Sequence, residues 1–161
     1  MPFRLSLPFV LLLSPLLVDG ASKYSGPRPP KPDVLYLLHA DNLIETEVAA
    51  AKEEARKDAS VATIPGASSP VKTPLAEPIF LVKTNQLLPD KLAAYKFEVK
   101  NGNREVVIGH KKQKNVARPI FLMITKLDDN LYRVEVDQPL ENGEYTISPE
   151  GSNDTFNFQI Y

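Results

Sequence analysis

The fold of this chain is decided by residues 120–147, which read IFLMITKLDDNLYRVEVDQPLENGEYTI. The apolar run at 120–124 predicts the most buried strand of the chain. A turn at 128–130 follows, and apolar residues then alternate with charged ones over 132–137, so one face of this second strand is expected to be exposed. An Asn-Gly pair at 142–143 precedes a third strand. The stretch therefore predicts antiparallel β-structure.

Short strands of the same character recur along the chain, at 34–38, 61–64, 79–82, 95–99, 106–108 and 156–160. Asn101 and Gly102 are expected to form a tight hairpin turn. No long amphipathic helix separates the strands, so about eight or nine of them predict an all-β fold, an antiparallel β-sandwich. An immunoglobulin-like Greek key is the finer expectation. Leu140, Gly143 and Tyr145 have the spacing of a tyrosine corner, and an ordinary half-buried strand tyrosine is the alternative.

Residues 45–59 have the weakest strand character. Alanines and alternating Lys and Glu residues favour a helix, and Val48 is the only large apolar residue among them. A helix without an apolar stripe has nothing to bury against a core. We therefore predict one short surface helix or a crossing loop at this place.

The N-terminal residues predict export. Residues 5–18 are almost entirely apolar, follow one basic residue, Arg4, and are too few to span a membrane as a helix, which is the layout of a secretory signal peptide. Cleavage is expected after Gly20, with Ser22 as the alternative position, so 1–20 is the predicted signal peptide. The mature protein is expected to be periplasmic or extracellular.

Behind the signal, the proline-rich residues 21–32 are expected to form an extended linker, and 33–161 a single β-sandwich domain. The chain contains no cysteine, which excludes disulfides, thiolate metal sites and a lipoprotein anchor. Its net charge of −1 argues against a general polyanion binder, and no nucleic-acid partner is expected. No second apolar segment approaches membrane-spanning length, so no membrane span is expected after cleavage.

Three pieces of the chain carry a resemblance to a known family. They are the hairpin at 34–39, the segment IPGASSPVK at 64–72, and the ending LENGEY at 140–145 with FNFQI at 156–160. These pieces resemble uncharacterised exported bacterial proteins that share a domain of unknown function. The family more often has Phe-Cys-Phe-Gly-Val near its end and a glycine-rich stretch in place of 52–58, so Asn157 and Gln159 depart from its pattern. The resemblance implies a small secreted bacterial β-domain and brings no activity with it.

Residues with the chemistry of a catalytic or metal site are few. His39 and His110 are the two histidines, and neither has a second ligand at a metal-binding spacing, so no metal site and no cofactor are expected. The serines at 68–69 lack a nucleophile pattern and are expected to be turn residues. The aspartates at 128–129 are neighbours on a hairpin turn and are expected to point apart into water. We predict no catalytic residue.

A basic cluster, His110, Lys111, Lys112 and Lys114, follows Gly109 between two strands. Solvated charge on a hairpin is the plain interpretation. The sharper hypothesis is a loop that binds an anion or a partner in the envelope, such as an acidic polysaccharide, a lipid phosphate or a protein. The cluster has no interleaved aromatic residues, so nucleic-acid stacking has no support.

Taken together, these patterns predict a non-enzymatic binding or structural module of the cell envelope. Exposed sheet edges of a sandwich can accept a partner strand, which makes strand addition an available mode of action. A hydrolase that acts on envelope material, with its site on loops from distant parts of the chain, is the alternative. The oligomeric state is not predicted by the sequence.

Overall fold

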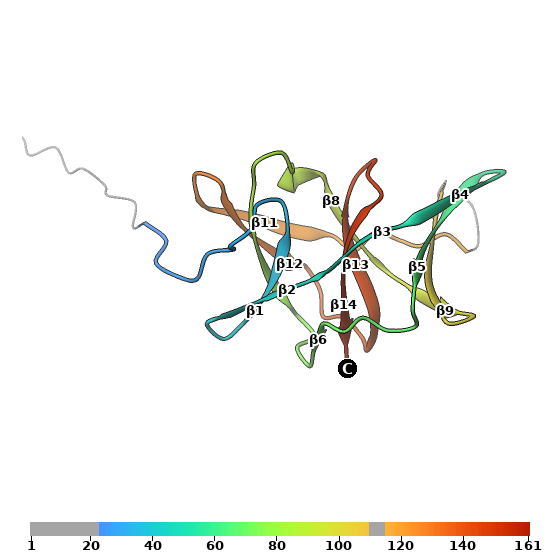
Figure 1. Cartoon of the computed structure of the whole chain (residues 1–161), viewed down its shortest axis with the longest axis horizontal. Coiled ribbons are helices and arrows are strands. Elements are labelled where there is room, and N and C mark those ends of the chain that lie inside the picture. Colours follow the sequence, from blue (N-terminus) through green and yellow to red (C-terminus); the bar gives the residue numbers. More distant parts are fainter. Residues whose placement is uncertain (1–22, 110–114) are drawn as a thin grey trace, which may run out of the picture.

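The computed structural model describes residues 23–109 and 115–161, and its regular structure is almost entirely β-strand (Figure 1). The strands are β1 (Leu35–His39), β2 (Asn42–Glu45), β3 (Glu47–Ala50), β4 (Lys52–Arg56), β5 (Ala59–Pro65), β6 (Lys72–Thr73), β7 (Ile79–Lys83), β8 (Leu92–Lys96), β9 (Glu98–Lys100), β10 (Asn103–Gly109), β11 (Leu122–Asp128), β12 (Leu131–Val136), β13 (Gly143–Pro149) and β14 (Asp154–Ile160). A 3₁₀ turn, η1 (Pro89–Lys91), precedes β8, and the described residues contain no α-helix. The all-β prediction is confirmed. The prediction that 120–124 form the most buried strand is wrong, because β11 is an outermost strand of its sheet and Phe121 and Met123 are 73% and 50% exposed.

The strands form three sheets that follow one another along the length of the molecule (Figure 1). The first sheet has the order β11-β12-β7-β1-β2, the central sheet β3-β14-β13-β8 and the third sheet β4-β5-β10-β9. Neighbouring strands in these orders are antiparallel, and the short β6 pairs parallel with the end of β14. The predicted antiparallel sandwich is confirmed, whereas the strand orders do not confirm an immunoglobulin-like Greek key.

The first and central sheets face each other across the main hydrophobic core. Its fully buried members include Leu35, Leu37, Phe80, Val82 and Val134 from the first sheet, and Ile147, Phe156, Phe158 and Ile160 from the central sheet. The ring centroids of Phe80 and Phe158 lie 4.9 Å apart, so side chains from the two sheets interdigitate. Each such side chain contributes roughly 1.5–3 kcal/mol on burial, which makes this core the main source of stability.

The opposite face of the central sheet packs on the third sheet through a second, thinner core. Successive side chains of a strand point to opposite faces, so the central sheet can be covered on both sides. Ile64, Phe97 and Val106 are buried here together with Ala51. The partly buried residues around them are mostly alanines, at 49, 62 and 117, beside Tyr95. This second core therefore encloses much less side-chain volume than the main core.

Two backbone crossings join the central and third sheets. The chain passes from β3 to β4 at Ala51 and from β8 to β9 at Phe97, and both residues are buried. At the first crossing the Ala51 N–H donates to the carbonyl of Asn153 at 2.8 Å, and at the second the Phe97 N–H donates to that of Glu144 at 2.8 Å. The third sheet is thus built on strands that continue out of the central sheet.

Local turn chemistry accounts for two predicted features. Asn101 and Gly102 have φ angles of 52° and 76°, the left-handed values that a tight hairpin turn requires. The Tyr145 hydroxyl donates to the backbone carbonyl of Glu141 at 2.7 Å, where the chain enters the central sheet after leaving the first. The hydrogen bond of a tyrosine corner is therefore confirmed.

The prediction of a surface helix or loop over 45–59 is wrong, because β3, β4 and the start of β5 occupy this stretch. Helix propensity is a weak preference that pairing with distant residues can override. Here β4 pairs with β5 across a two-residue turn at 57–58, and β3 pairs with β14 near the end of the chain. Every residue of β4 is exposed, so no apolar alternation marks it as a strand.

Residues 28–32, which end the predicted linker, contact three strands of the first sheet. Arg28 pairs with Asp128 of β11, Lys31 Nζ lies 2.9 Å from a Glu45 carboxylate oxygen of β2, and Pro32 forms a parallel bridge with Lys83 of β7. These contacts hold the segment across the first sheet.

Candidate functional site

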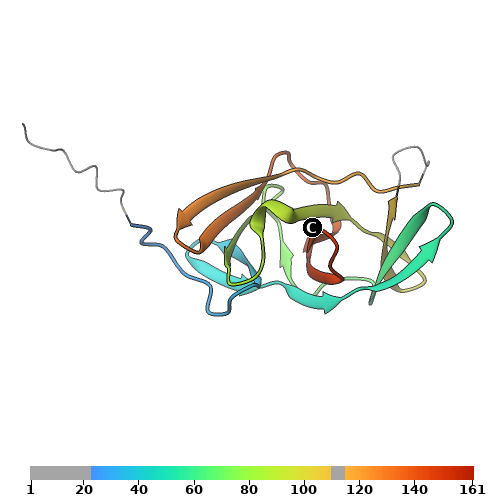
Figure 2. The same cartoon turned by 90° about the horizontal axis from the view of Figure 1, so that it is seen from above.

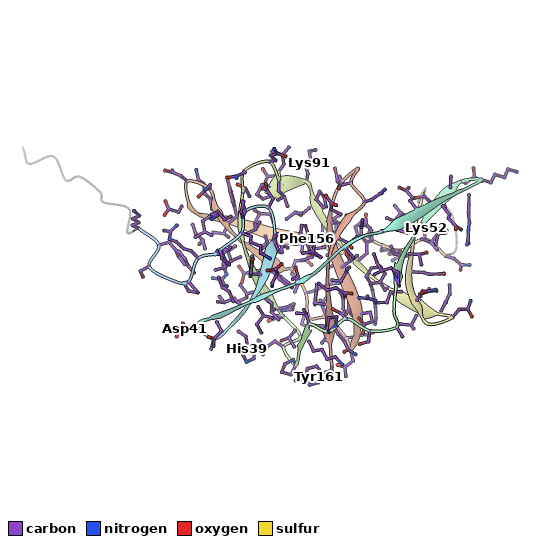
Figure 3. All side chains as sticks on the ribbon, in the orientation of Figure 1. His39, Asp41, Lys52, Lys91, Phe156 and Tyr161 are labelled. Carbon is purple, nitrogen blue, oxygen red and sulfur yellow. The ribbon has the colours of Figure 1, made fainter. Side chains whose placement is uncertain are left out.

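The structure describes some of the candidate site residues predicted from the sequence and not others. The predicted basic cluster, His110, Lys111, Lys112 and Lys114, lies outside the described residues. His39 is exposed at the end of β1 (Figure 3). No group of three or more His, Cys, Asp or Glu side chains that could hold a metal ion occurs in 23–109 and 115–161.

The serines and aspartates have structural partners. The Ser69 hydroxyl accepts the N–H of Val71 at 3.2 Å, which is the turn role predicted for it, and the Ser69 N–H donates to Glu144 at 2.9 Å. Asp128 pairs with Arg28 and accepts the N–H of Asp129 at 3.0 Å. The hydrogen bond from Arg28 lowers the pKa of Asp128, so its carboxylate is held in the charged form.

A continuous extended segment, residues 42–56, is the most unusual feature of the fold, and we call it the edge segment. It contains β2, β3 and β4, and these are the outermost strands of the first, central and third sheets respectively. Figure 1 shows it as a teal ribbon that crosses the whole molecule, and Figure 2 shows it along one rim. In Figure 3, Asp41 precedes its first strand and Lys52 begins its last. At about 3.3 Å per residue the segment extends for about 50 Å.

Backbone hydrogen bonds show which groups of β3 face outward. The Ala51 N–H donates inward to Asn153, and hydrogen-bonding direction alternates along an antiparallel strand. Ala49 therefore also faces β14, whereas Val48 and Ala50 direct their N–H and C=O groups to the open side. A row of unpaired backbone groups of this kind is a template for another strand.

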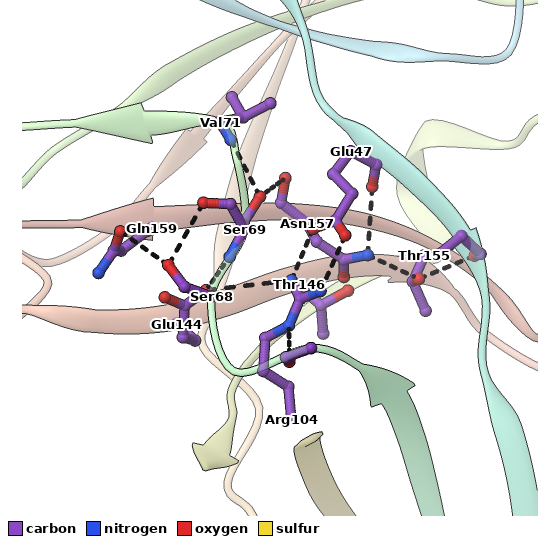
Figure 4. A network of polar contacts seen from close by, with 12 residues as sticks. Glu47, Ser68, Ser69, Val71, Arg104, Glu144, Thr146, Thr155, Asn157 and Gln159 are labelled. Atoms are coloured by element: carbon purple, nitrogen blue, oxygen red, sulfur yellow. Dashed lines mark hydrogen bonds and ion pairs between the residues drawn. The ribbon is translucent and has the colours of Figure 1, made fainter. Parts of the chain in front are cut away.

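A buried polar network holds β3 from its inner side (Figure 4). The Arg104 guanidinium on β10 donates to both carboxylate oxygens of Glu47, at 2.6 and 2.8 Å, and to the carbonyl oxygens of Gly66 and Pro65 at 3.0 and 3.1 Å. Arg104 is only 1% exposed, so these bonds are shielded from water. The fork of the guanidinium matches a carboxylate in two-point contact, which fixes the direction of β3 as well as its position.

Two side chains of β14 add to this network. Asn157 Nδ2 donates to the Glu47 carbonyl oxygen at 3.1 Å, and Thr155 Oγ1 donates to the Ala49 carbonyl oxygen at 2.8 Å. The β3 backbone is thus bonded inward by side chains as well as by the sheet ladder. A strand held in this way has little conformational freedom left to lose when it binds a partner.

The charge state of Glu47 follows from its surroundings. Partial burial opposes ionisation, but hydrogen bonding by Arg104 and Ser69 and the positive charge of Arg104 together outweigh it, so the pKa of Glu47 lies below its ordinary value of 4.5. The carboxylate is therefore charged at neutral pH, and both of its oxygens accept hydrogen bonds from Arg104.

The exposed side chains differ sharply along the edge segment. Every residue of β4 is exposed and four of the five are charged, which is the usual protection of an edge against unwanted pairing. On β3, by contrast, the exposed residues are Val48, at 49%, and Ala50. The middle of the edge segment therefore lacks this protection.

Sequence reasoning anticipates an available sheet edge but does not locate it, and it misses Arg104. One signal does mark this arginine. Arg104 and Val106 are two residues apart on β10, so they share a face, and both are buried. A charged residue in phase with the apolar positions of a strand indicates a buried, paired charge.

Comparison with protein-family models, with curated proteins and with solved structures found no match. In the part of the chain that the structure describes, no helix is both long enough and apolar enough to cross a membrane.

Proposed function

We propose that this chain is an exported, non-enzymatic binding module of the bacterial cell envelope that accepts an extended strand of a partner protein at the outer edge of β3. The observation that carries the proposal is the edge segment, one stretch of chain that is outermost in all three sheets. Its centre is held from the inside by Arg104, Asn157 and Thr155 and is free of charge on the outside.

Strand addition uses the backbone groups that β3 leaves unpaired. Each new backbone hydrogen bond contributes about 0.5–1.5 kcal/mol, and covering the exposed part of Val48 adds an apolar contribution. Because β3 is short, we expect a reversible contact with a dissociation constant of about micromolar size.

The side chains of the edge segment define the partner. Opposite Val48 and Ala50 the partner strand is uncharged and β-branched, because such residues pack best on a small apolar surface. Lys52 and Glu54 lie next along the segment, so the partner carries one acidic and one basic residue beyond its apolar part. This pattern selects a protein segment over a polysaccharide.

The proposed location of the protein in the cell rests on the sequence. Residues 5–18 have the layout of a signal peptide, and the absence of cysteine suits a fold stabilised by burial and backbone pairing alone. The protein would act in the periplasm or outside the cell.

Peptide selection followed by a matched pair of proline variants tests the proposal. A display library of random ten-residue peptides is screened for binding to the purified protein. The peptide that is enriched, here called the selected peptide, is synthesised, and its binding is measured by calorimetry. Ala50→Pro removes an outward N–H and places a ring on the open side, so we expect at least about tenfold weaker binding.

Ala55→Pro is the control. Arg56 and Ala59 pair next to the hairpin turn at 57–58, and the direction of the backbone hydrogen bonds alternates along β4, so the N–H of Ala55 points away from β5. We expect this variant to bind like the unsubstituted protein. Equal loss in both variants, or loss in neither, contradicts the proposal. A dimer of the unsubstituted protein that Ala50→Pro abolishes would make a second copy the occupant and would also contradict it.

A further inference from the structure

A cleft of about 290 Å³ lies between the central and third sheets. Its walls include Tyr95 and Ala93 of β8 on one side, and Ala62 of β5 with Val106 and Ile108 of β10 on the other. The two sheets are joined at the buried crossings Ala51 and Phe97, which also line the cleft, and they separate from there.

The cleft exists because small side chains occupy positions where a core would hold large ones. Alanines at 51, 62 and 93 and hydroxyl residues at 60, 146, 148 and 155 line much of it. The main core on the other face of the same central sheet is filled by Phe80 and Phe158. Protein interiors are normally packed without voids, and a hollow of this size costs stability. A retained, mainly apolar hollow with a few polar groups is typical of a ligand site.

Two hydroxyl groups of the cleft are held as acceptors. Ser148 Oγ donates to the Asp154 carbonyl oxygen and Thr155 Oγ1 to that of Ala49, both at 2.8 Å, so their protons are used. Thr155 Oγ1 also accepts from Asn157 Nδ2 at 3.0 Å, which leaves it one lone pair, whereas both lone pairs of Ser148 Oγ remain. Glu53 and Glu150 are the charged side chains among the described residues that line the cleft. Burial, and after it the charge of Glu150, raises the pKa of Tyr95, which agrees with a negative potential at this wall.

We propose that this cleft binds a small molecule with an apolar or aromatic body and a cationic amine. The body lies between the alanine and valine walls and against the Tyr95 and Phe97 rings. The ammonium group donates to the remaining lone pairs and is attracted by Glu53 and Glu150 and by the face of the Tyr95 ring. A dry cavity of about 150 Å³ is enough for a benzene ring, so the cleft has room for an aromatic ring with a short chain.

Three probes that share a phenylethyl body and differ in the charge of the end group test the proposal: 2-phenylethylammonium, 2-phenylethanol and 3-phenylpropionate. Binding to the full chain is followed by NMR titration of the backbone amides. We expect saturable shifts at Ala62 and Ala93 with the ammonium probe. Binding should be about tenfold weaker for the neutral probe and weaker still for the anion. Equal binding of all three, preference for the anion, or no shift with the ammonium probe at millimolar concentration overturns the proposal.

Two variants separate the apolar and ionic parts of the site. Ala93→Leu fills the hollow, and we expect it to abolish the titration. Glu150→Gln lies on an exposed turn, and we expect it to weaken ammonium binding about fivefold while leaving the alcohol unaffected. Unchanged ammonium binding in Glu150→Gln contradicts the proposal even if Ala93→Leu fails to fold. The outer edge of β3 takes no part here, so Ala50→Pro should leave amine binding intact, and the two proposals can fail separately.

Discussion

Arg104 and Glu47 join two different sheets through a pair of hydrogen bonds of 2.6 and 2.8 Å. Arg104 belongs to β10 of the third sheet, and Glu47 begins β3 of the central sheet. The side chain of Arg104 is 1% exposed and that of Glu47 22% exposed. The pair thus fixes the proposed binding edge to the rest of the fold.

We predict that Arg104→Ala is strongly destabilising. The substitution leaves Glu47 and the carbonyl oxygens of Gly66 and Pro65 without their donor, and breaking a buried pair on one side costs about 3–5 kcal/mol. Urea unfolding measures the change. Arg104→Lys keeps the charge but cannot make the two-point contact, so it should recover only part of the loss. A loss below about 1 kcal/mol for Arg104→Ala would contradict this assignment.

The same pair predicts how stability depends on pH. Because the pKa of Glu47 is lowered in the folded state, its contribution is fully present above the ordinary value of 4.5 and is lost as the pH falls through the folded-state value. We therefore expect stability to rise with pH across this acidic range. Urea midpoints for the unsubstituted protein and for Glu47→Gln between pH 2.5 and pH 6, about the range over which carboxylates titrate, measure the effect. The dependence should be shallower in Glu47→Gln, and identical slopes would contradict the prediction.

Tyr145→Phe isolates the tyrosine corner. The ring remains beside Phe158, 5.7 Å between centroids, and only the hydroxyl bond to the Glu141 carbonyl is lost. We expect a loss of about 0.5–1.5 kcal/mol, the usual net value of one hydrogen bond. Thermal unfolding measures it, and an unchanged or raised melting temperature would show that the bond has no net stabilising effect.

Asp33 holds the turn that follows β7. Its carboxylate accepts the N–H groups of Asn85, Gln86 and Leu87 at 2.7, 3.1 and 3.0 Å. Burial opposes its ionisation, but these bonds outweigh it and lower the pKa of Asp33. We predict that Asp33→Ala costs about 1–2 kcal/mol, in the range of a lost helix cap, and that Asp33→Asn costs less. Denaturant unfolding distinguishes the two, and equal stability of all three proteins would contradict the prediction.

The sequence predicts well those strands that have one buried face. The alternation of apolar and charged residues over 132–137 predicts β12, and the pair Asn101 and Gly102 predicts the β9–β10 hairpin. Both patterns involve only residues that are close together in the chain. The tyrosine corner is also local, because Tyr145 reaches back only four residues to Glu141.

The edge segment is not predictable in the same way. β4 has no buried face, so its sequence lacks an alternating pattern, and its alanines and charges favour a helix. β3 is a strand because it pairs with β14, whose residues come more than 100 positions later. The contact between Arg104 and Glu47 joins residues 57 positions apart in the chain, and only the phase of Arg104 with Val106 hints at it. Features that depend on long-range pairing are those that local patterns leave open.

The most direct measurement of the central claim is amide hydrogen exchange of β3, by NMR, without and with the selected peptide. In the free protein, the N–H groups of Val48 and Ala50 should exchange rapidly, and that of Ala49, which faces β14, slowly. With the peptide bound, we expect Val48 and Ala50 to become protected by at least about tenfold. Protection confined to other parts of the chain, with Val48 and Ala50 still in rapid exchange, would contradict strand addition at this edge.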